Sequence, residues 1–120
     1  LGTDFVTSAG GKGANQAVAA ASIGVVCKEN GVHMIGRVGK DDMGRGLLKG
    51  LRSRGVSNDE EESMVSGEHT GVASINVSSS GQNTIIVASG ANFSLTAKEV
   101  DSSLTKLLQN GGMQSQRDVV

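Results

Sequence analysis

At 120 residues the chain is long enough to bury a hydrophobic core, and its formal net charge of −1 gives no general attraction to nucleic acid or anionic membranes. Its only aromatic residues are two phenylalanines, which argues against the base stacking that single-strand binders use. The single cysteine, Cys27, excludes an internal disulfide, and no apolar stretch is long enough to cross a bilayer. We therefore expect a cytoplasmic protein with no nucleic-acid or membrane partner.

The first motif is a glycine-rich segment, residues 10–13, in front of a helix predicted over residues 14–23. That helix has one face of small apolar residues at the i, i+3, i+4, i+7 spacing, formed by Ala14, Ala17, Val18 and Ala21. Glycines let the backbone approach a ligand, and the unpaired N–H groups of a helix N-terminus attract polar oxygens. Lys12 adds a cation, and Asn15 adds an amide that both donates and accepts. We predict a site for a small, oxygen-rich molecule.

Two generic phosphate-binding motifs fit this segment badly. A P-loop has Ser or Thr after its Gly-Lys pair, but Gly13 follows Lys12 here. A dinucleotide fingerprint has a small residue where Gln16 stands. A glycine-rich loop that only connects a strand to a helix remains an alternative.

The next elements predict a mostly parallel sheet. Residues 4–7 read as a short extended segment that leads into the glycines, and residues 32–35 read as a buried strand. Gly24 is placed to end the first helix, and Gly55 to end a second helix that starts near residue 42. Strand, helix and strand in this order indicate a βαβ layout.

Acidic residues occur at two places. Asp41 and Asp42 could be metal ligands or an acid–base pair, but neighbouring side chains point in different directions, so we favour a helix-capping role. Residues 58–62 carry four consecutive acids without the ligand spacing or turn glycine of a calcium loop, and we interpret them as a solvated loop. We interpret His33 and His69 as structural, since neither has a ligand partner at motif spacing.

Two β-rich runs, residues 70–77 and 84–88, flank a polar turn and predict a hairpin. It should project from the main sheet and could cover a ligand. A last helix begins at Thr96, which forms a capping box with Glu99, and stops at residues 111–112. Its expected buried face consists of Val100, Leu104, Leu107 and Leu108. The tail at residues 117–120 resembles the start of another strand.

Five motifs, in order along the chain, resemble those of the ribokinase-like sugar kinases. They are residues 10–17 (GGKGANQA), 36–44 (GRVGKDDMG), 68–73 (EHTGVA), 81–83 (GQN) and 90–92 (GAN), the last followed by Leu95-Thr96. The first motif alone is only suggestive, but the ordered set is specific and covers almost the whole chain. Within the family it favours the ribokinase branch over the fructose, adenosine and tagatose-phosphate branches.

The resemblance implies an α/β fold with a mostly parallel sheet, flanking helices and a small projecting β lid. In such enzymes five residues of the first motif touch the sugar, and they match Gly11, Lys12, Gly13, Ala14 and Asn15. The side chains matching Lys12 and Asn15 bond its hydroxyls. Lid residues matching Ala73 and Ile75, with one face of residues 85–87, close over the ring, and two lids often pair in a homodimer. The implied reaction is phosphoryl transfer from ATP, with Mg²⁺ and a monovalent cation (K⁺), to the primary hydroxyl of ribose or a similar sugar.

Several family features have no counterpart in these 120 residues. They are a first strand with an Asn and an Asp for the sugar, the Gly-Ala-Gly-Asp motif with the anion hole and catalytic base, the nucleotide-binding elements and the monovalent-cation loop. We therefore assign no catalytic residue and no metal ligand in this chain, Asp41 and Asp42 included. Two local departures are a loop lengthened through residues 26–30 and Ser89 in place of a frequent proline or alanine.

We interpret the chain as an N-terminal fragment of such a kinase, with an α/β core at residues 1–63 and 89–120 and a lid hairpin at about residues 64–88. The fragment alone is expected to lack kinase activity and to be marginally stable, because exposed sheet edges invite aggregation. The alternative is a non-catalytic sugar-binding or dimerisation module from a truncated gene product. The poor P-loop and dinucleotide matches disfavour a third alternative, a nucleotide-binding module.

Overall fold

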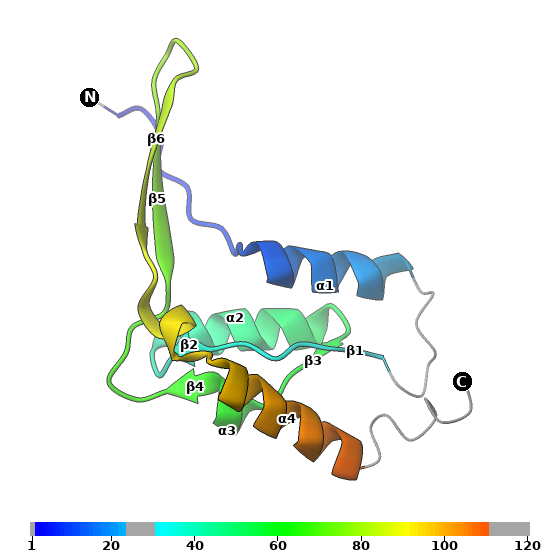
Figure 1. The fold of residues 1–120 in the computed structure, drawn as a ribbon. Helices are drawn as coiled ribbons and strands as arrows, with labels where there is room; N and C mark the ends of the chain where they lie inside the picture. The colour runs from blue at the N-terminus through cyan, green and yellow to red at the C-terminus, as the bar shows by residue number, and fades with distance from the viewer. Residues whose placement is uncertain (1, 24–30, 111–120) are drawn as a thin grey trace.

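The structure, a computed structural model, describes residues 2–23 and 31–110. In Figure 1 short strands run between helices, with α1 (Lys12–Ile23) on one side and α4 (Ala97–Gln109) on the other, and a long hairpin projects from one end. Four expected features lie outside the described residues: the cap at Gly24, the longer loop at 26–30, the stop at 111–112 and the strand at 117–120.

Two parallel strand pairs form the centre of the fold. β1 (Val32–His33) pairs with β3 (Val56–Ser57), and β2 (Val38–Gly39) pairs with β4 (Met64–Val65). Each ladder continues by one backbone bond, from Met34 N–H to the Ser57 carbonyl (2.8 Å) and from Lys40 N–H to the Val65 carbonyl (3.0 Å). The Val56 side chain in β3 is fully buried, so the core lies between these strands and the helices that pack on them.

The sheet is smaller than the sequence predicts. The expected extended segment at residues 4–7 pairs with no strand in the described part of the chain, and its Phe5 and Val6 are 94% and 84% exposed. The strand expected over residues 32–35 keeps strand geometry for two residues only. A strand needs a neighbour for its backbone N–H and C=O groups, and the β propensity of one segment says nothing about whether that neighbour exists.

The second helix, α2 (Asp42–Ser53), is capped as predicted. Asp41 is its N-cap, and the Gly44 N–H donates to Asp41 Oδ1 at 2.7 Å. On the inner face Leu48 is buried, and α2 packs on β2 and β3. Gly55 follows the helix with a φ of +84°, the left-handed conformation that glycine adopts without strain.

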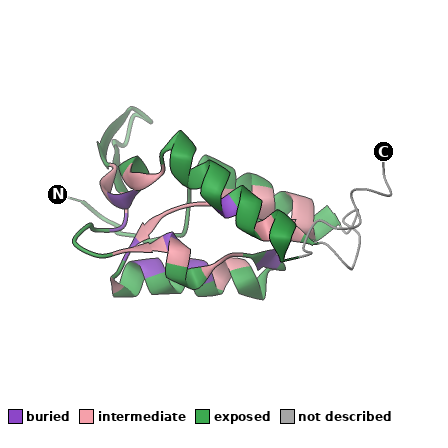
Figure 2. Ribbon diagram, turned by 60° about the horizontal axis from the view of Figure 1, so that its bottom comes forward, coloured by how far each residue is buried: buried purple, intermediate pink, exposed green. Residues whose placement is uncertain are grey.

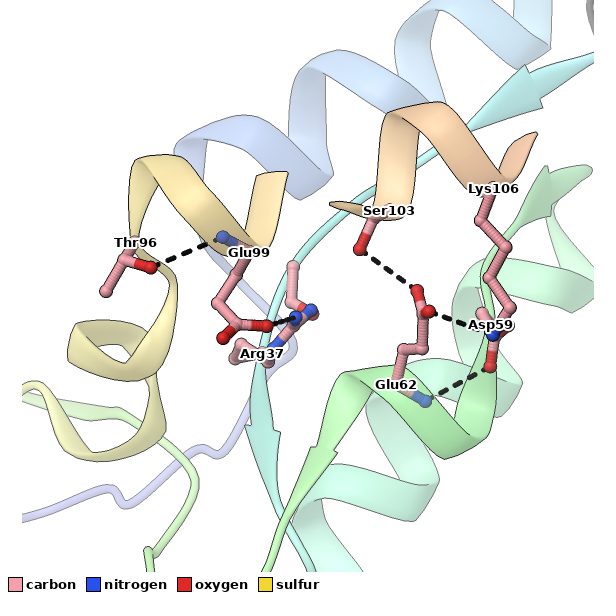
Figure 3. Close-up of polar contacts among 8 residues, drawn as sticks. Arg37, Asp59, Glu62, Thr96, Glu99, Ser103 and Lys106 are labelled. Carbon is pink, nitrogen blue, oxygen red and sulfur yellow. Dashed lines mark hydrogen bonds and ion pairs between the residues drawn. The ribbon is translucent and has the colours of Figure 1, made fainter. Parts of the chain in front are cut away.

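The acidic segment is a short helix and not the solvated loop that we expected. Asp59 caps α3 (Glu60–Ser63) by accepting from the Glu62 N–H at 3.1 Å. The Glu62 carboxylate accepts from Ser103 Oγ at 3.0 Å and from Lys106 Nζ at 2.9 Å (Figure 3). Both partners belong to α4, so this segment joins two parts of the fold.

The last helix, α4, is capped by Thr96, whose Oγ1 accepts from the Glu99 N–H at 3.3 Å. The second half of the expected capping box is absent, because the Glu99 carboxylate pairs with Arg37 Nη2 at 3.3 Å (Figure 3). The expected buried face is also rotated. Ser103 is buried against α3, while three of the predicted face residues are 38–50% exposed: Val100, Leu104 and Leu108.

The hairpin consists of β5 (Val72–Val77) and β6 (Asn83–Ala88), paired antiparallel from Val72↔Ala88 to Val77↔Asn83. This confirms the predicted hairpin. Every residue of both strands is exposed, as Figure 2 shows. β4 falls inside the expected lid region, residues 64–88, yet it pairs with the core strand β2, so the projecting part starts only after it.

Candidate functional site

The glycine-rich segment forms the N-terminus of α1. Gly11 has a φ of +106°, and its carbonyl accepts from the Asn15 N–H at 2.9 Å, the bond that starts the helix. Helix geometry leaves the amides of residues 11–14 without an intrahelical acceptor. Lys12, Gly13 and Asn15 are exposed around them, and Ala14 is half-buried. We call residues 11–15 the cradle, since it offers amide, ammonium and carboxamide groups within a single helical turn.

Small residues fix the cradle against the strands. α1 packs on β1 and β3, and the predicted face of α1 is half-buried there. A Cβ on Gly13 would lie 3.6 Å from Met34 Cε, and one on Gly55 would lie 3.7 Å from the Ala21 Cβ. Alanines and glycines at this contact let the helix lie close to the sheet, so the cradle has a defined place in the fold.

Ala73 and Ile75 lie in β5, on a different element from the cradle. Register puts five apolar side chains on one hairpin face: Ala73, Ile75, Val77, Ile85 and Val87. Within the described residues no hydrogen bond joins this face to the cradle, and Ile75 is 57% exposed. We call this apolar surface the lid face.

Sequence reasoning missed a polar junction at the base of the hairpin, centred on Asp41 and Thr70. Thr70 is only 3% exposed; its hydroxyl donates to Asp41 Oδ1 at 2.6 Å and its N–H donates to Asp41 Oδ2 at 2.9 Å. The hydroxyl also accepts from the Gly39 N–H at 3.0 Å. Bonds from the Thr70 hydroxyl, the Thr70 amide and the Gly44 amide lower the pKa of Asp41 from 3.8 to about 2.

Glycines make this junction possible. A Cβ on Gly39 would run into the backbone around Glu68 and His69, and one on Gly44 would run into the Gly39 carbonyl. In the 3-10 helix that follows β6, η1 (Gly90–Ser94), the Ala91 N–H donates to the His69 carbonyl at 2.9 Å. Three of the five sequence motifs therefore meet here, those at residues 36–44, 68–73 and 90–92. The spacing of Asp41 and Thr70 could not reveal this, because 29 positions separate them.

A second group of charged side chains lies where α3 meets α4, and its members pair with one another: Lys106 pairs with Glu62 and Asp59. Hydrogen bonds from Lys106 and Ser103 lower the pKa of Glu62, and the bond to Glu62 raises the pKa of Lys106 (Figure 3). A shallow cavity of about 300 Å³ lies beside it, lined in part by His33, Arg37 and Asn58. Since Lys106 is paired with Glu62 and Arg37 with Glu99, this cavity offers no uncompensated cation among its described residues to an anionic ligand.

The described part of the chain shows neither a candidate metal site nor a candidate membrane-spanning helix. Residues 2–23 and 31–110 contain no group of three His, Cys, Asp or Glu side chains that could hold a metal ion. Among their helices none is long and apolar enough to span a bilayer.

Comparison with known proteins gives the cradle and hairpin a family context. Residues 1–117 match the model of the pfkB family of carbohydrate kinases. The chain belongs to this family. A ribokinase of Bacillus subtilis is 46% identical over 96 residues, which are 80% of this chain and 30% of that protein. This match confirms the resemblance found in the motifs.

Solved structures of pfkB family members agree with the fold. The structure of ribokinase from Giardia lamblia has a TM-score of 0.67 and 35% identity, over 89% of this chain and 32% of that one. The ribokinase of Cryptococcus neoformans, in complex with ADP, has a TM-score of 0.61 and 37% identity, over 79% and 27%. These confirm the expected α/β fold. The chain spans about a third of the length of these relatives.

Proposed function

We propose that this chain is the sugar-binding segment of a kinase that transfers the γ-phosphate of ATP to the primary hydroxyl of ribose, giving ribose 5-phosphate. The observation that carries the proposal is the cradle at the start of α1. Sugar hydroxyls both donate and accept hydrogen bonds, and the cradle presents donors from Lys12 and the backbone and a two-way amide from Asn15. Relatives described as ribokinases support ribose as the substrate.

The lid face supplies the apolar side of the site. Ala73 and Ile75, with the facing residues of β6, would cover the carbon side of the sugar ring and exclude water, so that phosphoryl transfer is not lost to hydrolysis. Binding between a polar cradle and an apolar cover is typical of small-molecule sites. The same exposed face could also pair with a second copy, and we propose a homodimer through the hairpin.

The nucleotide, Mg²⁺ and K⁺ would be held by other parts of the protein, together with the catalytic base. The ADP complex of the Cryptococcus neoformans relative supports nucleotide use. Asp41 is unsuited to be the base, because its oxygens accept three hydrogen bonds and its pKa is about 2. We propose a cytoplasmic location, where ATP is available, and no nucleic-acid or membrane partner.

The test is ATP-dependent phosphorylation of ribose. It compares the 120-residue chain with an extended protein, the same gene product carrying the residues that flank this chain on both sides. We expect activity in the extended protein alone. Ribose binding without turnover in the extended protein would favour the alternative, a non-catalytic sugar-binding or dimerisation module. Turnover by the 120-residue chain alone would overturn the assignment of the catalytic base to another part of the protein.

Two lysine variants test the cradle itself in the extended protein. Lys12→Met removes the cation at the start of α1 and should raise the KM for ribose about tenfold or more, since a sugar hydroxyl loses its partner. Lys49→Met removes an exposed cation from α2 and is the matched control. Equal KM values for the two variants would place the sugar somewhere other than the cradle.

A further inference from the structure

The hairpin is attached to the rest of the described chain through its base (Figure 1). Both strands are exposed along their whole length, and they pair with each other. The angle between the hairpin and the core is therefore decided where residues 68–71 enter and residues 89–92 leave. A two-stranded ribbon has little stability of its own, so the contacts at its base determine how far it can swing.

The entering strand is held by Thr70. Its hydroxyl bridges two partners, donating to Asp41 and accepting from the Gly39 N–H, and both Thr70 and Gly39 are buried. The segment that leaves the hairpin forms the 3-10 helix η1 (Gly90–Ser94), which packs on β2 and whose Ala91 N–H donates to the His69 carbonyl of the entering segment. Thr70 therefore fixes the entering segment to the core, and the Ala91–His69 bond couples that segment to the leaving one.

The same junction is connected to the cradle through regular secondary structure. Asp41 caps α2, α2 packs on β3, and α1 packs on β3 beside it. Packed helices and strands move together as a nearly rigid unit, because close-packed interiors deform little. The hairpin base and Gly11 therefore belong to one mechanically connected unit.

We propose that Thr70 and Asp41 are positioning residues, which set the angle of the hairpin to the core and so hold the lid face in register with the cradle. This inference rests on the proposed function, in which the lid face covers the sugar. Without the Thr70 hydroxyl, the Gly39 amide and Asp41 Oδ1 each lose a hydrogen bond in a buried junction, and the hairpin gains freedom to tilt.

The experiment compares Thr70→Val with Thr70→Ser in the extended protein. Valine has the shape of threonine without its hydroxyl, whereas serine keeps the hydroxyl and loses one methyl group. Spin labels on cysteines at Ser79, in the hairpin turn, and Lys49, on the exposed side of α2, report the hairpin angle as a distance distribution. The labels are placed in a background without other cysteines.

Thr70→Val should broaden or shift this distribution, and Thr70→Ser should leave it as in the parent protein. Unchanged distributions in both variants would overturn the proposal. This readout needs no kinase activity, so it tests the junction even if the extended protein does not phosphorylate ribose, an outcome that would count against the proposed function alone.

Steady-state kinetics test whether the hairpin angle affects ribose binding. Thr70→Val should raise the KM for ribose about tenfold and leave the KM for ATP unchanged, while Thr70→Ser stays within about twofold of the parent. Loss of folded protein would lower the apparent kcat and leave both KM values alone. A ribose KM that stays at the parent value despite a broadened distance distribution would refute the positioning role.

A second substitution covers the case in which Thr70→Val does not fold. Asp41→Asn keeps the size of the side chain but places an NH₂ group where an oxygen accepts, so it should also broaden the hairpin distances and raise the ribose KM. Asp42→Asn is its control, because the Asp42 side chain is fully exposed. Parent-like behaviour of Asp41→Asn would likewise overturn the proposal.

Discussion

Replacing Gly44 by alanine should destabilise the protein, although the same replacement stabilises most helices. Gly44 lies in the first turn of α2, and its amide donates to Asp41. A Cβ there would run into the Gly39 carbonyl and would come within 2.9 Å of Thr70 Oγ1 and 3.0 Å of Val38 Cγ2. Gly46 is two residues further along the same helix, and a Cβ there meets nothing within 4 Å. Comparing Gly44→Ala with Gly46→Ala therefore separates the effect of the close contact at the junction from the effect of helix propensity.

The two effects have opposite signs. At Gly46 alanine gains up to about 1 kcal/mol, because it loses less backbone entropy than glycine on entering a helix. At Gly44 overpacking against a backbone carbonyl costs about 1–3 kcal/mol, and the propensity gain offsets only part of it. We expect Gly44→Ala to lower the free energy of unfolding by about 1 kcal/mol, so that the two variants differ by about 2 kcal/mol.

Urea unfolding of the extended protein, followed by circular dichroism, measures this difference. With an m-value of about 2–3 kcal/mol per molar urea, the two midpoints should lie about 0.7–1 M apart, one on each side of the parent. If Gly44→Ala matched Gly46→Ala in sign and size, the close approach of α2 to the junction would be wrong.

Three further predictions concern the cradle, the junction and the lid face. Asn15→Ala should raise the KM for ribose in the extended protein about tenfold or more, measured at saturating ATP; an unchanged KM would remove Asn15 from the site. The folded pKa of Asp41, about 2, lies below its ordinary 3.8, so its carboxylate stabilises the fold above about pH 4 and this contribution is lost as the pH falls toward 2. Urea melts of the parent and of Asp41→Asn at a series of pH values should therefore converge in acid, and a constant gap would contradict the assignment. Ile75→Asp puts a charge on the lid face and should shift the extended protein from dimer to monomer in sedimentation velocity, whereas Ser74→Asp, on the opposite face, should not.

Local sequence patterns predicted the features that depend on interactions between residues close together in the sequence. The caps at Asp41 and Thr96 follow from short polar side chains in front of amphipathic segments, and the structure confirms both. The hairpin follows from alternating β-branched residues around a polar turn, and it is also confirmed. The cradle residues stay together because they are adjacent in sequence and start one helix. Their contact with a sugar stays a prediction.

Patterns failed where a partner distant in sequence decides the outcome. The acidic run at residues 58–62 looked like a loop because its partners, Ser103 and Lys106, lie more than 40 positions away. The same contact turns Ser103 inward on α4 and leaves Leu104 and Leu108 half-exposed, against the expectation from periodicity. Thr70 carried no signal as a single residue. Its role appears only once the fold brings Asp41 beside it.

At the junction, Gly39 and Gly44 lie directly against backbone atoms, and this limits which substitutions these positions can accept. A side chain that clashes with its neighbour can be accommodated when the neighbour becomes smaller, but a carbonyl oxygen has no smaller replacement. Gly39 and Gly44 face carbonyls, so no second substitution can compensate for a change there. The exposed strands of the hairpin have no such limit. Natural variation can thus alter the lid face while the junction that carries it stays the same.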